Sequence, residues 1–253
     1  MNHLLIALVS FACLFGSASL GWYLRDRLPG HHLNEASVSV IKLATSLIAT
    51  MAALVLGLLI SSAKGTFDKA NAELVETAAQ VLQFDRVLAR YGPETQAVRD
   101  ILRRNYLGIV AVLATGDTLQ LKRLNDHEAI KRSEALRREV EQLPALDAEH
   151  AALKVSALSI MDEVFAMRGL LMLQTTSSVP PALLIALIVW LSIIFGTFGL
   201  FTARNGTVSA VVLMCALSTS VSILLIEELN RPLDGLIGVS LDPMRDTLSR
   251  LGQ

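Results

Sequence analysis

Four stretches of this chain contain no Asp, Glu, Lys or Arg: residues 4–24, 43–63, 169–203 and 205–226. Each stretch is at least 21 residues long. A helix needs roughly 20 residues to cross the hydrocarbon core of a bilayer, which is about 30 Å thick. The four stretches therefore predict a polytopic membrane protein with four transmembrane helices. The lipid bilayer is accordingly one of its expected partners.

The composition agrees with a membrane protein. Of the 253 residues, 18% are charged and 53% hydrophobic, and the net charge is -1, whereas soluble domains carry about 25% charged residues. This balance excludes a wholly soluble enzyme, a disordered chain, a disulfide scaffold and a basic nucleic-acid binder. Cys13 and Cys215 both lie in apolar stretches and are interpreted as small buried hydrophobic side chains.

The first apolar stretch has two interpretations, a retained helix or a cleaved secretory signal that ends near Gly16-Ser17-Ala18-Ser19. No Lys or Arg precedes the apolar run, although a signal peptide normally begins with positive charge. The run continues through Trp22 and Tyr23, which suit a membrane interface, to Arg25-Asp26-Arg27. These features favour a retained transmembrane helix.

The charges divide the chain into four parts. Residues 64–168 hold 15 of the 22 Lys and Arg residues and 16 of the 23 Asp and Glu residues. We therefore predict an all-α membrane protein with a first transmembrane pair, a helical region between the second and third membrane helices, a second transmembrane pair and a tail. The expected ranges are 1–63, 64–178, 179–226 and 227–253.

The region between the two pairs has a helical pattern and no sustained strand alternation. One helix is expected over 67–90, ending before Gly92-Pro93, and another from Pro93 to about Thr115. The apolar positions of the first are Leu74, Ala78, Val81, Leu82, Val87 and Leu88. A third would begin at Asp117 and end near Pro144, and a fourth would run from 144–147 to about Leu173. We expect these helices to continue from the second membrane helix and into the third.

Pro180-Pro181 opens the third membrane helix, expected over 181–203. The turn to the fourth helix is only about Arg204-Asn205-Gly206, so these two helices should be antiparallel neighbours. The fourth is expected to end at Ile226. The tail should finish in a short amphipathic helix that includes Met244, Leu248 and Leu251.

Four spans place both termini and residues 64–178 on the same side of the membrane. The charges in the short flanking segments are nearly balanced between the two sides, so the positive-inside rule scarcely decides the orientation. The absence of any other export signal favours cytoplasmic termini.

No zinc spacing, P-loop, dinucleotide glycine pattern or nucleophile elbow is present in the sequence. No catalytic residue, cofactor or metal ligand is therefore assigned, and an enzyme is not expected. The histidine pair His31-His32 is interpreted as polar interface residues. The membrane helices carry no ionisable residue between their ends, which argues against a proton pump or an ion-coupled transporter, whereas a passive pore needs no such group.

The second membrane helix carries a stripe of small and hydroxylated residues. At about 100° per residue, the stripe is roughly 80° wide, and Lys64 lies on it at one end, with Lys42 closing the other end of the helix. One interpretation is close helix packing through small residues, and the other is a pore wall with a positive mouth. The stripe consists of Ser46, Thr50, Ala53, Gly57 and Ser61. The opposite arc of the helix carries larger apolar residues, namely Ile48, Val55, Leu56, Leu59 and Ile60.

Several blocks of the sequence resemble the bacterial bestrophin-like family, and together they cover nearly the whole chain. The most specific of them spans the first connection. The sequence departs from the family pattern at Glu35-Ala36-Ser37-Val38, where Glu-Ser-Arg-Asp is common, and at Ser46, where Gly is common. The blocks are Arg25-x-Arg27-Leu28-Pro29-x-His31-His32-Leu33, residues 47–60, Ala63-Lys64-Gly65-x-Phe67-Asp68, residues 84–88, Tyr91-Gly92-Pro93-Glu94 and Glu228-Leu229-Asn230-Arg231-Pro232.

The resemblance implies four membrane helices and a large cytoplasmic helical part. Bestrophins are pentameric anion channels whose second membrane helix lines the pore, so the resemblance implies a homo-oligomer, five subunits by analogy, that passes small anions such as chloride. It further implies a multi-pass protein of the bacterial inner membrane with both termini cytoplasmic. The alternative is a non-conducting membrane scaffold or sensor whose helical domain binds a partner.

Overall fold

The computed structural model describes residues 3–29, 34–116, 127–174, 180–233, 235 and 237–253. These residues form eight α-helices and one short 3-10 helix and contain no strand, which confirms the all-α prediction for this part of the chain. The helices are α1 (His3–Arg27), α2 (Glu35–Tyr91), η2 (Pro93–Thr95), α3 (Gln96–Thr115), α5 (His127–Glu141), α6 (Ala148–Gln174), α7 (Pro181–Phe201), α8 (Gly206–Leu229) and α9 (Asp242–Arg250).

The chain forms two compact units. The first unit comprises residues 1–66 and 178–230, and the second comprises residues 67–177 and 231–253. The tail from Arg231 onward therefore packs with the second unit.

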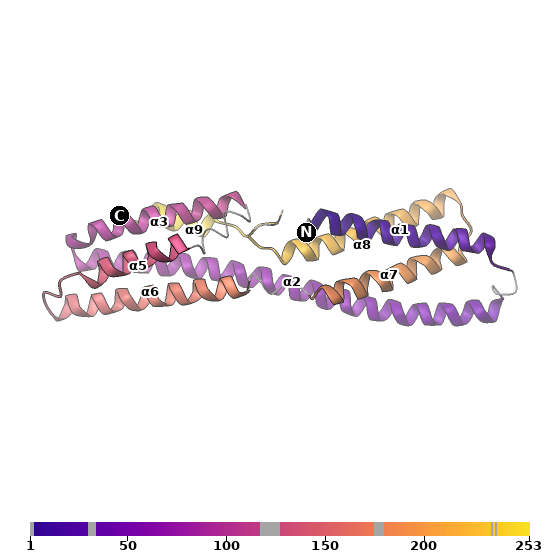
Figure 1. Cartoon of the computed structure of the whole chain (residues 1–253), viewed down its shortest axis with the longest axis horizontal. Helices are drawn as coiled ribbons and strands as arrows, with labels where there is room; N and C mark the ends of the chain where they lie inside the picture. The colour runs from indigo at the N-terminus through magenta and orange to yellow at the C-terminus, as the bar shows by residue number, and fades with distance from the viewer. Residues whose placement is uncertain (1–2, 30–33, 117–126, 175–179, 234, 236) are drawn as a thin grey trace. The chain divides into compact units, whose positions relative to one another are not determined.

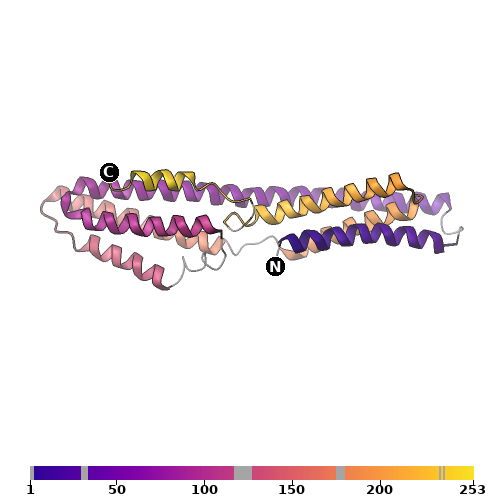
Figure 2. The same cartoon turned by 90° about the horizontal axis from the view of Figure 1, so that it is seen from above.

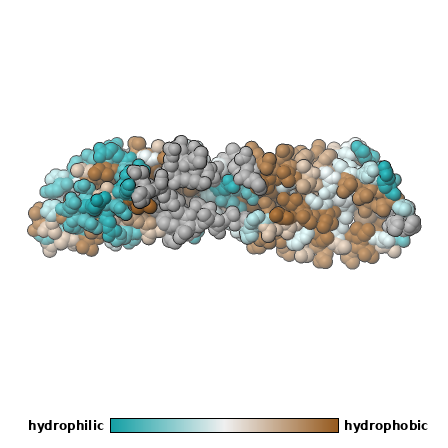
Figure 3. Space-filling view, viewed as in Figure 1, coloured by the Kyte–Doolittle hydropathy of each residue, from teal (hydrophilic) through white to brown (hydrophobic). Residues whose placement is uncertain are grey.

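In the first unit, α1 packs against α7 and α8, and these two helices contact the first part of α2 (Figure 1, Figure 2). Each of these four helices is long and apolar enough to cross a membrane. Brown, hydrophobic side chains dominate the visible face of this unit (Figure 3). The prediction of four membrane-spanning helices is confirmed in length and composition.

Three of the four helices, α1, α2 and α8, extend beyond the apolar stretches that predicted them, whereas α7 ends at Phe201, within its stretch. The second begins at Glu35 because Asn34 caps it, its Oδ1 accepting the N–H of Ser37 at 2.8 Å. It then runs for 57 residues to Tyr91, which confirms that the helix after the second span continues from it. Asn205 caps α8 in the same way, its Oδ1 accepting the N–H of Val208 at 2.8 Å.

The expected continuation of the fourth helix into the third membrane helix is wrong. Pro180 has φ -54 and ψ 119, an extended conformation, and α7 begins only at Pro181. A residue before proline is driven out of the helical region by the proline ring, so the Pro180-Pro181 pair separates α6 from α7. The predicted cap at Asp117 lies outside the described residues, which resume at His127.

The second unit has its own hydrophobic core, built by the later part of α2 with α3, α5, α6 and α9. The apolar positions expected on α2, including Leu74, Ala78, Val81 and Leu88, are buried in this core. The tail helix α9 buries Met244, with Leu251 just after it, as its amphipathic pattern predicted. The chain turns between α2 and α3 at Gly92, whose φ of +136 favours glycine over any other residue.

Candidate functional site

The buried face of α2 in the first unit contacts the second transmembrane pair. Ala52, Leu59 and Ala63 are nearly or completely buried. They belong to a cluster with Leu187 and Ile194 of α7 and Ile226 of α8. This contact uses one side of α2 and leaves the remaining sides of the helix exposed.

The stripe predicted from the sequence lies on an exposed side. All five of its residues are exposed, and so are the two lysines that bracket it. A Cβ added at Gly57 would have no described atom within 4 Å outside its own helix. Within a single chain, the stripe therefore does not mediate helix packing. The residues concerned are Ser46, Thr50, Ala53, Gly57 and Ser61, with Lys42 and Lys64.

Two hydroxyl groups of the stripe are already engaged with the helix backbone. Ser46 Oγ donates to the carbonyl oxygen of Lys42 at 2.9 Å, and Thr50 Oγ1 donates to that of Leu47 at 2.8 Å. Such local bonds are common for Ser and Thr within helices. An anion beside the stripe would have to compete with these carbonyls for the hydroxyl protons.

A second exposed side of α2, next to the stripe, is large and apolar. Its residues recur at four- and seven-residue intervals, so they share one helix face. Sequence reasoning placed the bulky arc on the side opposite the stripe, which is the side that the chain buries, and missed this face. Its members are Leu43, Leu47, Leu54 and Leu58, each more than 60% exposed.

Close packing through small residues does occur, but between α1 and α7. A Cβ on Gly199 would lie 2.0 Å from the carbonyl oxygen of Ala18, and one on Gly21 would lie 2.3 Å from that of Gly196. Only hydrogen fits at such positions, as at other close helix crossings in membranes. The glycines themselves were the available signal, but the sequence cannot say which distant helix they face.

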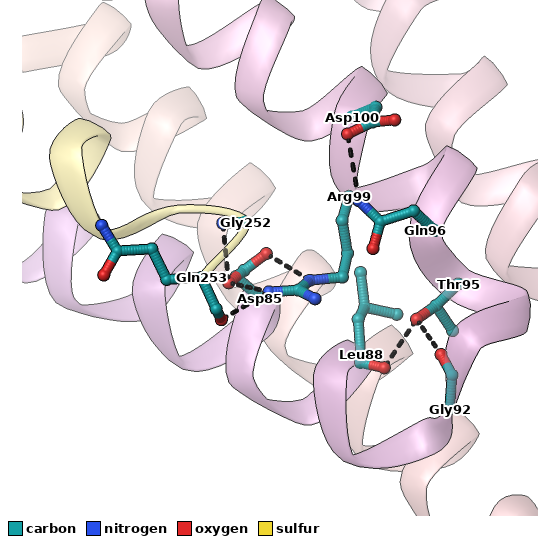
Figure 4. Close-up of polar contacts among 9 residues, drawn as sticks. All are labelled: Asp85, Leu88, Gly92, Thr95, Gln96, Arg99, Asp100, Gly252 and Gln253. Atoms are coloured by element: carbon teal, nitrogen blue, oxygen red, sulfur yellow. Dashed lines mark hydrogen bonds and ion pairs between the residues drawn. The ribbon is translucent and has the colours of Figure 1, made fainter.

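The second unit contains a buried ion pair that the sequence pattern did not reveal. Arg99 Nε donates to Asp85 Oδ1 at 2.8 Å, and Arg99 Nη2 donates to Asp85 Oδ2 at 3.0 Å (Figure 4). Both side chains are buried, and the hydrogen bond that Arg99 donates to Asp85 raises the pKa of Arg99. Arg99 therefore stays charged, and because either side chain would be costly to bury without the other, the pair fixes α3 against α2.

The same pair binds the end of the tail. The N–H of Gly252 donates to Asp85 Oδ2 at 3.3 Å, and Arg99 Nη2 donates to the carbonyl oxygen of Gln253 at 3.0 Å (Figure 4). Close by, Thr95 Oγ1 donates to the carbonyl oxygens of Leu88 and Gly92 across the turn. These bonds join α2, the following turn, α3 and the tail in one polar cluster.

The two cysteines and the histidine pair noted in the sequence do not form a functional site among the described residues. Cys13 and Cys215 are exposed in the single chain, so the prediction that they are buried is wrong. Both lie in helices that are apolar all round, where composition cannot distinguish a face covered by protein from one covered by lipid. The pair His31-His32 lies outside the described residues, and no cluster of three or more metal-ligating side chains occurs within them.

The sequence matches a family model described as a bestrophin-like domain over residues 12–244. The chain belongs to the bestrophin-like family. This match confirms the family resemblance found in the sequence. The four helices able to cross a membrane agree with a membrane protein of this family. No curated protein matches the chain.

Solved structures share the bestrophin-like fold over their whole length. A bacterial bestrophin homolog from Klebsiella pneumoniae is 19% identical, with a TM-score of 0.65, covering 100% of this chain and 99% of that one. A single-residue variant of a bestrophin homolog from the same organism is 20% identical, with a TM-score of 0.64, covering 100% of both chains. At this identity the likeness establishes the fold alone.

Proposed function

We propose that this bestrophin-like chain assembles into a ring of identical subunits that conducts small anions such as chloride. In this arrangement α2 of each subunit faces the axis with Ser46, Thr50, Ala53, Gly57 and Ser61. The observation that carries the proposal is the exposure of this stripe in the single chain. Small and hydroxylated side chains on an exposed membrane helix suit a narrow aqueous path better than lipid.

The two lysines account for the proposed selectivity. Lys42 and Lys64 lie at the two ends of the apolar part of α2, about 33 Å apart along a helix that rises 1.5 Å per residue. That spacing matches the thickness of a bilayer core. One positive charge attracts an anion by only about 1 kcal/mol at 4 Å in water, but rings of lysines add their attractions. Anions should therefore enter more readily than cations.

Assembly would also cover part of the exposed apolar surface of α2. The face formed by Leu43, Leu47, Leu54 and Leu58 lies beside the stripe, where a neighbouring subunit in the ring would approach. Closed rotational symmetry is the usual outcome for identical subunits, and five subunits are proposed by analogy with bestrophins. The proposed location is the bacterial inner membrane, with both termini and residues 64–178 in the cytoplasm.

The test is ion flux from liposomes that contain the purified protein. Thr50→Trp should block chloride flux without preventing assembly, as checked by mass measurement in detergent. Met214→Trp is the control, because Met214 is an exposed residue of α8 and lies neither on the stripe nor on the apolar face of α2 that a neighbouring subunit would cover. Lys64→Glu should lower the chloride-to-sodium permeability ratio.

A non-conducting scaffold or sensor is the second candidate. The separate hydrophobic core of the second unit favours it, because such a domain can bind a partner without a pore. Assembled wild-type protein that passes no ions in liposomes would favour the scaffold. Flux that survives Thr50→Trp, with selectivity unchanged by Lys64→Glu, would mean that α2 does not line the path.

A further inference from the structure

Two hydrogen-bond donors near the end of α1 are buried without an acceptor. Trp22 Nε1 and Arg25 Nη1 are inaccessible to solvent, and no hydrogen-bond partner for either lies among the described residues. Trp22 as a whole is only 6% exposed. A buried donor left without an acceptor destabilises a fold, and the cost is greater for a charged donor. Such donors therefore indicate a bound group that supplies an acceptor.

The two donors belong to one face of α1. Leu14, Ala18 and Trp22 are buried at four-residue intervals, and Arg25 follows Trp22 by three. Residues three and four apart are neighbours on a helix surface. Arg25 therefore continues the face that packs inside the first unit.

A second arginine at the same helix end behaves differently. The guanidinium of Arg27 lies over the ring of Tyr23, 5.0 Å from its centre, and both residues are exposed. This is the usual arrangement for an arginine at a membrane interface, where the charge reaches water. Arg25 instead directs one nitrogen into the protein, although its guanidinium stays charged in any protein environment.

The surroundings of the two donors favour negative charge. Val208, in the first turn of α8, packs against the cluster that contains Trp22. The N-terminal end of a helix carries a partial positive charge and unpaired N–H groups, and both favour an anion. The side chain of Asn205 accepts a hydrogen bond from the N–H of Val208, and Arg204 in the same turn adds a further positive charge.

We propose that Trp22 Nε1–H and Arg25 Nη1–H bind an anionic acceptor at the end of the first unit where α1 ends and α8 begins. The ligand is a halide or a phosphate group, supplied either by a free anion or by a lipid headgroup. This site is separate from the stripe on α2 and does not require that the protein conducts.

The test measures thermal unfolding of the protein purified in a maltoside detergent, with sodium gluconate holding the ionic strength constant. Sodium chloride and inorganic phosphate are titrated in one arm, and phosphatidylglycerol in the other. Stabilisation by the salts would identify the ligand as a free anion, and stabilisation by the lipid alone would identify it as a lipid headgroup. Both results support the site provided that Arg25→Gln and Trp22→Phe weaken the apparent affinity about tenfold or more, as expected when a donor is lost.

The matched controls are Arg27→Gln and Tyr23→Phe, which alter the same helix end on its exposed side and should keep the wild-type response. Arg25→Lys retains the charge and should partly restore binding, which separates loss of the site from loss of folding. Trp22 and Trp190 are the two tryptophans of the chain, so in a Trp190→Phe background the emission of Trp22 should shift as ligand is added.

The proposal is overturned if neither salt nor lipid stabilises the wild-type protein. It is equally overturned if Arg25→Gln responds as Arg27→Gln does. In either case water, or an acceptor from elsewhere in the chain, satisfies the two donors.

Discussion

Asp85 and Arg99 lie 14 residues apart, on α2 and α3, and are joined by two parallel hydrogen bonds inside the second unit. Paired donors and acceptors of this kind are stronger than single neutral bonds and fix orientation as well as distance. Because the pair also binds the backbone of Gly252 and Gln253, one ion pair holds three segments of the unit together.

Arg99→Gln should destabilise the second unit strongly. The change leaves the Asp85 carboxylate, which is 1% exposed, without its counter-ion, and breaking a buried pair in this way costs about 3–5 kcal/mol in the free energy of unfolding. Urea denaturation followed by circular dichroism measures the loss.

The control for this prediction is Arg137→Gln. Arg137 pairs with Glu141 and Asp162 on the surface, and exposed ion pairs add little to stability. The double variant Asp85→Asn/Arg99→Gln should be less destabilised than Arg99→Gln alone, because no buried charge remains. Equal losses for Arg99→Gln and Arg137→Gln would contradict the structural role of the pair.

Gly199→Ala should destabilise the first unit. The new methyl group would lie 2.0 Å from the carbonyl oxygen of Ala18, so α1 and α7 would have to separate, at a cost of about 1–3 kcal/mol. The melting temperature in detergent reports the effect.

Gly16→Ala provides the comparison for Gly199→Ala. A Cβ at Gly16 meets no described atom within 4 Å outside its own helix, and alanine is the better helix former by roughly 0.5–1 kcal/mol. This variant should therefore be neutral or slightly stabilised. A similar drop in both variants would mean that the contact between α1 and α7 is not the cause.

The sequence predicted the membrane helices and the core of the second unit because the signals for both are local. Absence of charge over 20 or more residues located the spans, and the spacing of Leu74, Ala78, Val81 and Leu88 located the core of the second unit. The pairing of Asp85 with Arg99 could not be read in the same way, since α2 and α3 each carry several other charges. The contact of Gly199 with Ala18 could not be predicted either, because Ala18 lies on α1, far from Gly199 in the sequence.

The neighbours of the exposed stripe on α2 could likewise not be predicted from the sequence. Periodicity placed Ser46, Thr50 and Gly57 on one side of the helix, but it could not decide whether α7 and α8 would cover that side. The structure shows that they contact the side with Ala52 and Leu59 instead. Whether another subunit or an aqueous path meets the stripe depends on molecules outside the single chain.

The first turn of α6 should lose stability as the pH rises. His150 Nδ1 lies 2.7 Å from Asp147 Oδ1, and this hydrogen bond raises the pKa of His150 above 6.5. The stabilisation is fully present below the ordinary histidine pKa and is lost as the pH rises through the raised value. Protection factors from hydrogen exchange correct for the faster intrinsic exchange of amides at higher pH. For residues 148–152 they should be lower at about pH 8 than at about pH 6.

His150→Gln should remove most of this pH dependence. The helix cap itself should remain, because Asp147 Oδ1 also accepts the backbone N–H of His150 at 2.8 Å. Bonds from His150 hold the pKa of Asp147 below 3.8, so the cap should weaken only as the pH falls through that lowered value. Equal protection factors in wild-type protein at the two pH values would contradict the proposed role of the His150 side chain.

Impermeant thiol reagents should distinguish the two sides of the membrane. Cys13 and Cys215 are exposed in the single chain, so both are first replaced by serine. Single cysteines at Asn34 and Ala145, both exposed, should then label from opposite faces of sealed vesicles, because one span and part of the following region separate them. Labelling of both from one face would exclude the four-span topology.

The contact between Gly21 and Gly199 has a consequence for how the protein is made. Ribosomes add about 5–20 residues per second, so α1 must wait on the order of 10 to 40 s in the membrane before α7 emerges to pack against it. During that interval the glycine face of α1 is open to other helices. The contact between α1 and α7 can therefore form only after most of the chain has been synthesised.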